Sequence, residues 1–472
     1  IPGKSGGGGG RKSGGSPLDP KDIEILAGFK AELLYTVPKD EQGSWVALTK
    51  DNKGRLIASD QGGKGLFRIS VSGSAEPKVK VEKLPVDLSG AQGMVWAFDS
   101  LYVHVSGRGL YRVTDTNGDD QLDKVEQLPG ANGGGEHGNH AVILTEDKKA
   151  LYVDAGNHTN LPETQGSRAL RNWNEDLLLP RQWDARGHAR GRLAPGGWVC
   201  RVTPDGKSYE IYSVGYRNQY DIALNRFGDM FTYDADMEWD LGMPWYRPTR
   251  ICHVVSGSDF GWRSGSGKWP TYYEDSLPPL VDIGPGSPTG FASGLGAEFP
   301  AKYQDALYAL DWTYGTIYAI HLEPNGAGYK GRREDFLSGI PLPVTDAIIG
   351  DDGAFYFAVG GRGAQSALYR VTYVGKESTV PVTAPVTFAP DKHAEARALR
   401  RKLESYHGKQ SNNALDFAWK HLGSEDRFIR HAARVAVEHQ RLSEILAKLS
   451  RTDDPQALIT GTIAAARTYR AD

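Results

Sequence analysis

The stretch DSLYVHVSGRGLYRVT, residues 99–114, contains two runs of aromatic and aliphatic residues on either side of a glycine-containing turn. Runs of this composition are typical of antiparallel strands joined by a tight turn. The same arrangement recurs in GRLIASDQGGKGLFRIS (54–70), KALYVDAGNH (149–158) leading to GGWVCRVTPDG (196–206), GDMFTYDADMEWD (228–240), DALYALDWTYGTIYAIHL (305–322) and GAFYFAVGGRGAQSALYRVT (353–372). We therefore expect a fold built from repeated strand pairs.

Six such units, at spacings of roughly 40 to 70 residues, predict an all-β six-bladed β-propeller, in which radial blades protect their strand edges by closing into a ring. The strand-like stretch FKAELLYTV, residues 29–37, is placed to complete the last blade and close that ring. A β-sandwich or barrel is the alternative for a chain of many short strands.

The chain divides into four parts by composition. Residues 1–22 are a leader rich in glycine and serine, expected to be disordered because they offer little apolar area to bury. The propeller is assigned to residues 23–375 and a Pro/Thr/Val linker to 376–390. Residues 391–472 carry apolar residues at helical spacing, and LGSEDRFIRHAARVAVEH (422–439) resembles a HEAT-like helical repeat. About two such units are visible, so the helical array is expected to be incomplete.

Charge and hydropathy exclude two classes of partner. Lys and Arg number 55 and Asp and Glu number 58, a net charge of −3, which argues against a nucleic-acid-binding protein. The chain contains no run of about 18 apolar residues, so no transmembrane segment is predicted.

The cysteine content is low. The only two cysteines, Cys200 and Cys252, exclude a Cys-rich zinc module and a haem-attachment motif in these residues. They either form one disulfide or are separately buried thiols. Scarce cysteine with 58 glycines and many aromatic residues favours a periplasmic or extracellular protein, with an envelope-associated location as one form of this.

The segment DTNGDDQLDKVE, residues 115–126, has the spacing of an EF-hand-type calcium loop. A hard cation requires this density of oxygen ligands. The glycine usual at the sixth position is replaced by Asp120. We predict a structural calcium ion here, the alternative being an acidic turn without an ion. The predicted ligands are Asp115, Asn117, Asp119, Gln121 (through its carbonyl), Asp123 and Glu126.

A second acidic run, YDADMEWD, places carboxylates at every second position from Asp234 to Asp240, on one face if the segment is a strand. Carboxylates so arranged repel one another unless a cation neutralises them. This predicts either a metal site that includes Asp234 and Asp236 or an ion-pair network with Arg247 and Arg250.

Three histidines lie in GEHGNHAVILTEDKKALYVDAGNH, residues 135–158. His137 and His140 are three residues apart outside a helix, which is weak support for zinc. In a propeller, the loop before a blade's inner strand opens onto the central channel, where a histidine is suited to act as a general base. His140 is the candidate base, His137 a supporting residue and His158 a second residue at the channel mouth. The alternative is a set of ordinary loop histidines.

The order of EHGNHAVILTEDKKALYVDAGNH, VGYRNQYDIALNRFGDMFTYDAD and GSDFGW resembles the soluble PQQ-dependent sugar dehydrogenases over about residues 30 to 375. The whole arrangement is similar to large secreted proteins described as membrane-bound dehydrogenases. In those proteins helical repeats follow the propeller and a c-type haem domain follows the helices. The haem domain is missing from these residues.

The resemblance implies an oxidoreductase that oxidises a sugar or another alcohol, with PQQ and calcium as cofactors and a cytochrome domain or protein as electron acceptor. His140 would take the hydroxyl proton, and Arg217 and Asn218 would contact the cofactor. The segment around Asp234 and Asp236 would lie where the family holds calcium against the quinone.

The sequence departs from the family where cations should contact the cofactor. The position of the family's lysine falls near Thr313, and PLPVTDA, at the position of an arginine pair, contains no arginine. Losing three cations that face a trianion predicts weaker PQQ binding by several kcal/mol, since each charge-assisted contact contributes roughly 1.5 to 3 kcal/mol. Arg362 compensates only in part.

Two other functions are compatible with the sequence. One is a non-catalytic, calcium-stabilised propeller that binds a glycan or protein. Its aromatic platforms would come from Trp239, Trp245, Trp262, Trp269 and Trp312. The other is a lyase or hydrolase that uses His137, His140 and nearby acidic residues around a metal.

Overall fold

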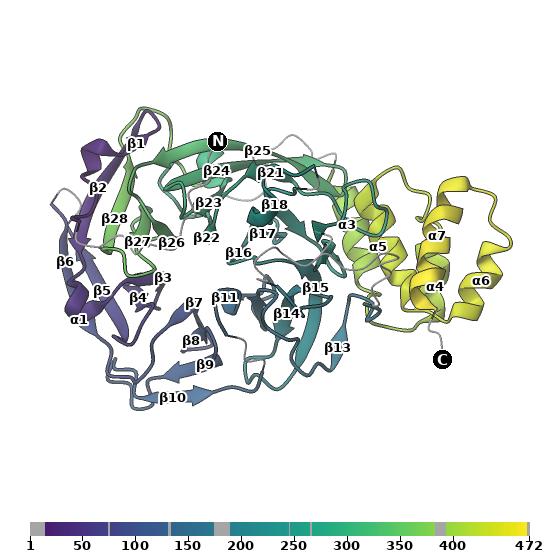
Figure 1. Ribbon diagram of the computed structural model, residues 1–472, viewed down its shortest axis with the longest axis horizontal. Helices are drawn as coiled ribbons and strands as arrows, with labels where there is room; N and C mark the ends of the chain where they lie inside the picture. Colours follow the sequence, from purple (N-terminus) through teal and green to yellow (C-terminus); the bar gives the residue numbers. More distant parts are fainter. Residues whose placement is uncertain are drawn as a thin grey trace.

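The computed structural model describes residues 15–73, 76–130, 134–173, 189–244, 246–264, 267–382 and 393–469. Most of its strands form six sheets arranged around a central axis, with a group of helices at one side (Figure 1). We name the sheets blades A to F in chain order. The predicted six-bladed β-propeller is confirmed.

Each blade has four main strands, counted outward from the axis. The inner strands are β3 (Trp45–Lys50), β7 (Ala91–Ala97), β11 (Asn139–Leu144), β16 (Ile222–Leu224), β22 (Pro288–Ser293) and β26 (Val344–Ile349). The second strands are β4 (Leu56–Asp60), β8 (Ser100–Val105), β12 (Leu151–Ala155), β17 (Met230–Asp234), β23 (Leu307–Asp311) and β27 (Phe355–Val359). The third strands are β5 (Leu66–Ser72), β9 (Gly109–Thr114), β14 (Gly197–Val202), β18 (Thr249–Val254), β24 (Thr316–Asn325) and β28 (Ala367–Tyr373). The outer strands are β6 (Lys78–Lys83), β10 (Lys124–Gln127), β15 (Tyr209–Tyr216), β21 (Val281–Gly284), β25 (Gly328–Ser338) and β2 (Phe29–Thr36).

Shorter elements lie between and beside these strands. They are η1 (Pro20–Asp22), β1 (Glu24–Ile25), α1 (Lys39–Gln42), β13 (Gly166–Ser167), η2 (Glu238–Asp240), β19 (Trp262–Arg263), β20 (Gly267–Lys268) and α2 (Ala301–Gln304).

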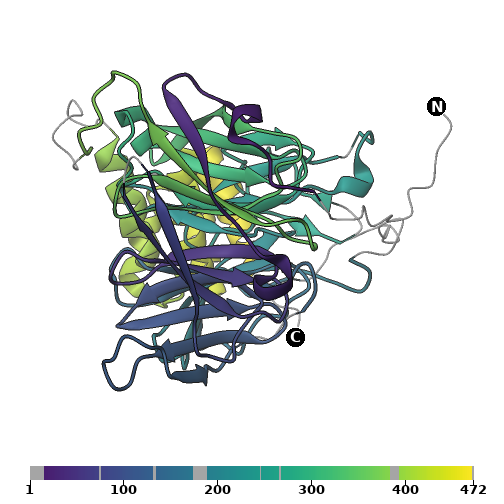
Figure 2. The ribbon, with the colours of Figure 1, turned by 90° about the vertical axis from the view of Figure 1, so that its left-hand side faces the viewer.

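The ring closes through its first long strand. β2 pairs antiparallel with β28, from Phe29 opposite Tyr373 to Thr36 opposite Ala367. Figure 2 shows this purple strand running beside the green strands of blade F. The prediction that residues 29–37 complete the last blade is confirmed, because the outer edge of blade F is covered by the start of the chain.

The hydrophobic core is divided into wedges between neighbouring blades. Trp45 and Phe67 of blade A pack with Tyr356 of blade F, for example, while Leu101 and Val103 of blade B pack on the other side of blade A. Each of the six interfaces between neighbouring blades has one such cluster. Burial of these clusters holds the blades in a ring and leaves the axis to polar residues.

An aspartate near the end of the second strand recurs in four blades. Each accepts a hydrogen bond from a backbone N–H at or just before that blade's own inner strand, at 2.6 to 3.1 Å. The four are Asp60, Asp154, Asp234 and Asp311. This contact fixes the loop that leads into the inner strand, and so it sets the wall of the central channel.

Five helices follow the propeller and pack around a common apolar cluster. They are α3 (Ala394–Glu404), α4 (Asn412–Trp419), α5 (Arg427–Glu438), α6 (Leu442–Leu449) and α7 (Pro455–Thr468). Asp426 accepts hydrogen bonds from the backbone of Phe428 and Ile429 and so caps α5. Asp426 also accepts from the backbone of Ala327 at 2.6 Å, which joins the helices to blade E. No helix within the described part of the chain is long and apolar enough to cross a membrane.

The two cysteines are separate. Cys200 lies in the cluster between blades B and C, and Cys252 in the cluster between blades C and D. Both are free and buried, so the alternative of two separately buried thiols is confirmed.

Candidate active site at the hub

A cavity of about 710 Å³ opens at the end of the propeller axis. Its wall is made by loops between second and third strands and by loops that lead into inner strands, the places where a propeller gathers residues from different blades. The lining is mainly neutral and polar, with Gln61, Gln92, Ser106, Asn218, Tyr220, Ser287, Thr289 and Thr345. His140, Trp312, Glu136, Arg108 and Arg362 complete the functional side chains.

His140 lies in β11 on the cavity wall, as the sequence predicts for the candidate base. Its ring stacks on Tyr220, with centroids 4.2 Å apart, and its Nε2 lies 2.8 Å from Asn218 Oδ1. The Asn218 amide nitrogen in turn faces the Glu136 carbonyl at 3.5 Å. This orientation makes the amide oxygen the acceptor, so Nε2 carries the ring proton and Nδ1 keeps its lone pair.

Burial lowers the pKa of His140 to about 3, because the cation would lose its hydration. The imidazole is therefore neutral at pH 7. Nδ1 is buried and makes no hydrogen bond to a described residue. A neutral ring of this kind is able to accept a proton.

The other two histidines of this segment form a separate pair. The His137 and His158 rings stack with centroids 4.4 Å apart, and His137 Nδ1 lies 2.6 Å from Asn157 Oδ1. Neither is among the residues that line the cavity. The structure thus brings only His140 to the hub, and the supporting role of His137 and the mouth position of His158 remain predictions.

The side chains of Arg217 and Asn218 lie in different places. Asn218 lines the cavity, whereas the Arg217 guanidinium forms an ion pair with Glu238 of η2 at 2.8 Å. Arg217 is not among the described residues of the cavity wall. The contact of Arg217 with a cofactor beside His140 therefore stays a prediction.

The acidic run after β17 forms ion pairs with the protein's own cations. Asp234 Oδ2 lies 3.2 Å from Arg250 Nη2 and 3.0 Å from Lys268 Nζ, and all three side chains are buried. Burial opposes the charge of Asp234, but Lys268 and Arg250 outweigh it and lower the pKa. Asp234 therefore forms the ion-pair network that the sequence gives as the alternative, with Arg250 and Lys268, and a metal ion bound by Asp234 and Asp236 stays a prediction.

β17 ends at Asp234, so Asp236 lies beyond the strand. Its carboxylate accepts a hydrogen bond from the Tyr246 hydroxyl at 2.7 Å. Burial raises the pKa of Asp236 to about 6, so a single tyrosine partner leaves it partly protonated near neutrality. Asp236 lies outside the described cavity lining, and its assignment as a cofactor ligand stays a prediction.

The loop from Asp115 to Asp123 closes on itself. Asp115 accepts the backbone N–H groups of Gly118 and Asp120 at 2.7 and 2.8 Å. Asp119 accepts from Gln121 and Asn117, and Asp123 accepts from Thr116. These are the bonds of an acidic turn, the alternative given by the sequence.

The last predicted calcium ligand does not return to this loop. Glu126 lies in β10 opposite Arg112, which it binds at 2.7 Å, two residue pairs beyond the Lys124–Thr114 pair that borders the loop. Among the described residues, no three His, Cys, Asp or Glu side chains are grouped to hold a metal ion. The structure therefore separates Glu126 from the other five predicted ligands, and calcium binding by this loop stays a prediction.

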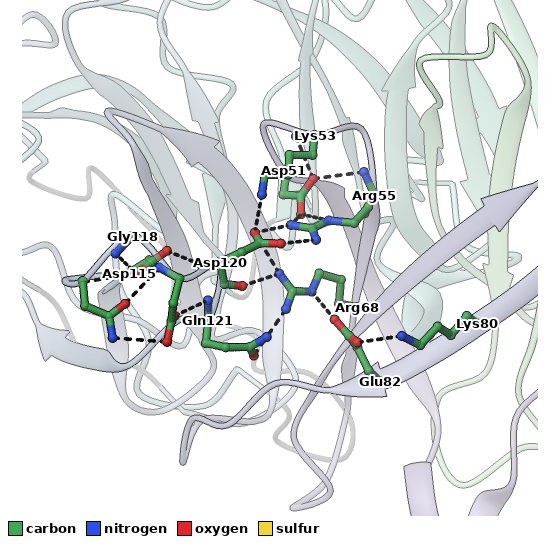
Figure 3. A network of polar contacts seen from close by, with 12 residues as sticks. Asp51, Lys53, Arg55, Arg68, Lys80, Glu82, Asp115, Gly118, Asp120 and Gln121 are labelled. Carbon is green, nitrogen blue, oxygen red and sulfur yellow. Dashed lines mark hydrogen bonds and ion pairs between the residues drawn. The ribbon is translucent and has the colours of Figure 1, made fainter.

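Asp120, the departure from the calcium pattern, has a different partner. It adopts a positive φ of 70° and sends its carboxylate to blade A, where Arg55 binds both oxygens at 2.6 and 2.7 Å (Figure 3). Lys53 lies 3.0 Å and Arg68 3.4 Å from the same carboxylate. The loop thus joins blades A and B through one carboxylate and three cations.

Replacing Asp120 by Asn is expected to lower the free energy of unfolding by about 1 kcal/mol at pH 7, since the bidentate contact is strong but partly screened by solvent. Its hydrogen bonds with Arg55 lower the pKa of Asp120 in the folded protein. The contribution is therefore present above the ordinary aspartate pKa of about 3.9 and is lost as the pH falls below it. Urea denaturation of both proteins should show a difference that shrinks below about pH 4. A difference that is constant from pH 7 to pH 3 would contradict this.

The described cavity lining offers few cations to a trianionic quinone. Arg362 has a φ of 48°, forms an ion pair with Glu136 and lies over the Trp312 ring at 5.4 Å. With Arg108, the described lining therefore has two cations and one anion. Thr313 is not among the described lining residues. With one excess positive charge, the described lining would balance a ligand with three carboxylates only together with a bound divalent cation.

The tryptophans proposed as platforms separate into different environments. Trp262 is fully buried, and Trp269 lies under Arg263 at 4.1 Å. Trp239 is 37% exposed, and Trp245 lies outside the described residues. Among the described members of this set, only Trp312 lines the cavity.

Two residues of the site were not predicted from the sequence. Tyr220 stacks on His140, and it stands three residues after Arg217 in the turn that the sequence does mark. Lys268 reaches Asp234 from an insertion between β18 and β21. No local pattern indicates Lys268, because its partner lies 34 residues earlier.

No protein-family model matches the chain, and no curated protein matches it. Among solved structures it is similar to an oxidoreductase described as a glucose dehydrogenase from Thermus thermophilus, with 18% identity over 73% of this chain and 100% of that chain, at a TM-score of 0.50. The PQQ-bound aldose sugar dehydrogenase of Streptomyces coelicolor is 16% identical over 74% of this chain and 99% of that chain, with a TM-score of 0.49. The PQQ domain of Coprinopsis cinerea pyranose dehydrogenase is 12% identical over 74% and 97%, with a TM-score of 0.49. The likeness to the Thermus structure shows a shared propeller fold.

Proposed function

We propose that the hub cavity binds a sugar or another neutral alcohol with several hydroxyl groups. The observation that carries this proposal is the neutral polar lining around Trp312. Hydroxyl and amide side chains such as Gln61, Gln92 and Thr289 both donate and accept hydrogen bonds, as a polyol requires. An indole face complements the apolar C–H face of a sugar ring.

Replacing Trp312 by Ala is expected to weaken binding of such a ligand about 10- to 100-fold, equivalent to about 1.4 to 2.7 kcal/mol, because a large buried contact is lost. Trp312 is held by a hydrogen bond from its Nε1 to the Gly360 carbonyl at 2.7 Å, so it meets a ligand in a fixed position. Calorimetry with a panel of sugars and polyols measures the change.

Trp239→Ala is the matched control, since Trp239 lies outside the described cavity lining and is 37% exposed. It is expected to leave the affinity unchanged. Wild-type protein that binds none of the sugars or polyols would refute the proposed ligand class.

Oxidation of that alcohol is the second candidate function, and neutral His140 favours it. Alcohol oxidation removes a proton from the hydroxyl oxygen and a hydride from the adjacent carbon. His140 is the group in the described lining that would take the proton, and the hydride would pass to a two-electron acceptor of the quinone class. The fold shared with a glucose dehydrogenase supports this candidate.

The two candidates differ in a direct test. Purified protein is mixed with each bound polyol and an artificial electron acceptor, with and without added PQQ and calcium. Reduction of the acceptor would support the oxidoreductase. Binding without any reduction would support a propeller that binds its ligand without catalysis.

Location, partner and helical repeats are part of the same proposal. An exported chain, periplasmic or extracellular, is supported by the glycine- and aromatic-rich composition. An electron-accepting cytochrome and a HEAT-like stacking of the helices are supported by the sequence resemblance and by paired packing of α4 with α5 and of α6 with α7. Cell fractionation followed by immunodetection tests the location.

A further inference from the structure

Lys268 is an ammonium group enclosed by protein. Its side chain is fully buried, with 0% exposure, and lies 3.0 Å from Asp234 Oδ2. It also donates a hydrogen bond to the carbonyl oxygen of Ala235. A buried lysine is costly unless it has such partners, so the sequence keeps a charge here at the expense of stability.

The partner of Lys268 is connected directly to the hub. Asp234 Oδ1 accepts the backbone N–H groups of Arg217 and Asn218 at 3.0 and 3.1 Å. The Asn218 side-chain oxygen then lies 2.8 Å from His140 Nε2. A continuous set of contacts therefore runs from Lys268 through Asp234 and Asn218 to the candidate base.

This arrangement is particular to blade D. Asp60, Asp154 and Asp311 occupy equivalent places and also accept backbone N–H groups. In the part of the chain that the structure describes, these three make no ion pair with a lysine or arginine side chain, whereas Asp234 contacts both Lys268 and Arg250. Capping a loop requires only the aspartate, so the cations of blade D need a separate reason.

The oxygens around Lys268 Nζ indicate why a cation is present here. A carboxylate and a backbone carbonyl are ligands that a hard cation prefers. Here the ammonium already satisfies both. It supplies a positive charge beside Asp234 without any metal.

We propose that Lys268 is the built-in cation of the hub, which takes the place of a metal ion beside Asp234 and positions Asn218 to hold His140 in one tautomer. This proposal rests on the hub cavity being the ligand site. It makes Lys268 and Asp234 positioning residues, which act through Asn218.

The test reads the ring nitrogens of His140 by 15N NMR in the full chain without ligand. In wild-type protein we expect a single tautomer with the proton on Nε2, unchanged by EDTA or by added calcium. Lys268→Met should mix the tautomers and weaken polyol binding at least 10-fold. Lys268→Arg, which retains the charge, should restore part of both properties.

Two further variants keep the test decisive. Asp234→Asn retains an oxygen for the backbone bonds but removes the charge, and it should shift the His140 signals even if Lys268→Met does not fold. Asp60→Asn makes the same change in blade A and should leave the His140 signals unchanged.

The proposal is overturned if calcium or EDTA changes the His140 signals of wild-type protein, or if Lys268→Met and Asp234→Asn leave them unaltered. Because these signals are read without ligand, failure of this proposal is distinct from failure of the proposed function. A wild-type protein that has the single tautomer but binds no polyol would refute only the latter.

Discussion

Replacing Arg400 by Met is expected to lower the free energy of unfolding by about 3 to 5 kcal/mol, because it removes the buried cation that pairs with two carboxylates. Arg400, in α3, binds Asp229 at 2.6 Å and Glu404 at 2.9 Å. The Arg400 and Asp229 side chains are only 2% and 4% exposed. Chemical denaturation measures the loss. Hydrogen exchange should show that α3 and β17 become less protected, since Asp229 immediately precedes β17.

Arg401→Met provides the matched control. Arg401 lies 3.2 Å from the same Asp229 carboxylate, but its side chain is 49% exposed. Solvent screening should limit its effect to less than about 1 kcal/mol. Equal losses for the two variants would contradict a dominant role for the buried pair.

Replacing His140 by Gln is expected to lower the turnover of a bound alcohol about 100- to 10,000-fold, because the amide of glutamine does not accept a proton in this pH range. Affinity for the alcohol should change far less, since the neutral lining contacts remain. Steady-state reduction of an artificial acceptor, together with calorimetry, separates the two effects.

The pH dependence gives an independent check on His140. Its pKa is lowered to about 3, so the basic form persists above about pH 4 and the rate should show no inflection near pH 6.5. His137→Gln is the control, since His137 comes from the same segment but lies outside the described cavity wall. An inflection near pH 6.5 that disappears in His140→Gln would show that the base titrates as an ordinary histidine.

The propeller was predictable because its information is local and repeated. The alternation in residues 99–114 became β8 and β9, and residues 29–37 became the closing strand β2. Outer strands were harder to identify, since they are partly exposed and less apolar. β6, with the sequence KVKVEK, carries three lysines and one glutamate among its six residues.

Site residues were predictable only where they follow the blade pattern. His140 and Asn218 stand at the start of inner strands or just before them, and the structure places both at the hub. The contacts of Asp120 could not be predicted, because its partners, Arg55 and Arg68, belong to another blade. The ion pair of Asp234 with Lys268 could not be predicted either, because it depends on an insertion whose path has no sequence signature.

The closing of blade F by β2 also makes the propeller circular in a topological sense. β2 and β28 are the first and last long strands of the ring, and they are hydrogen-bonded neighbours in one sheet. The packing of the six core clusters between neighbouring blades therefore does not depend on which strand comes first in the chain. The ring has no terminal blade from which it could begin to fray.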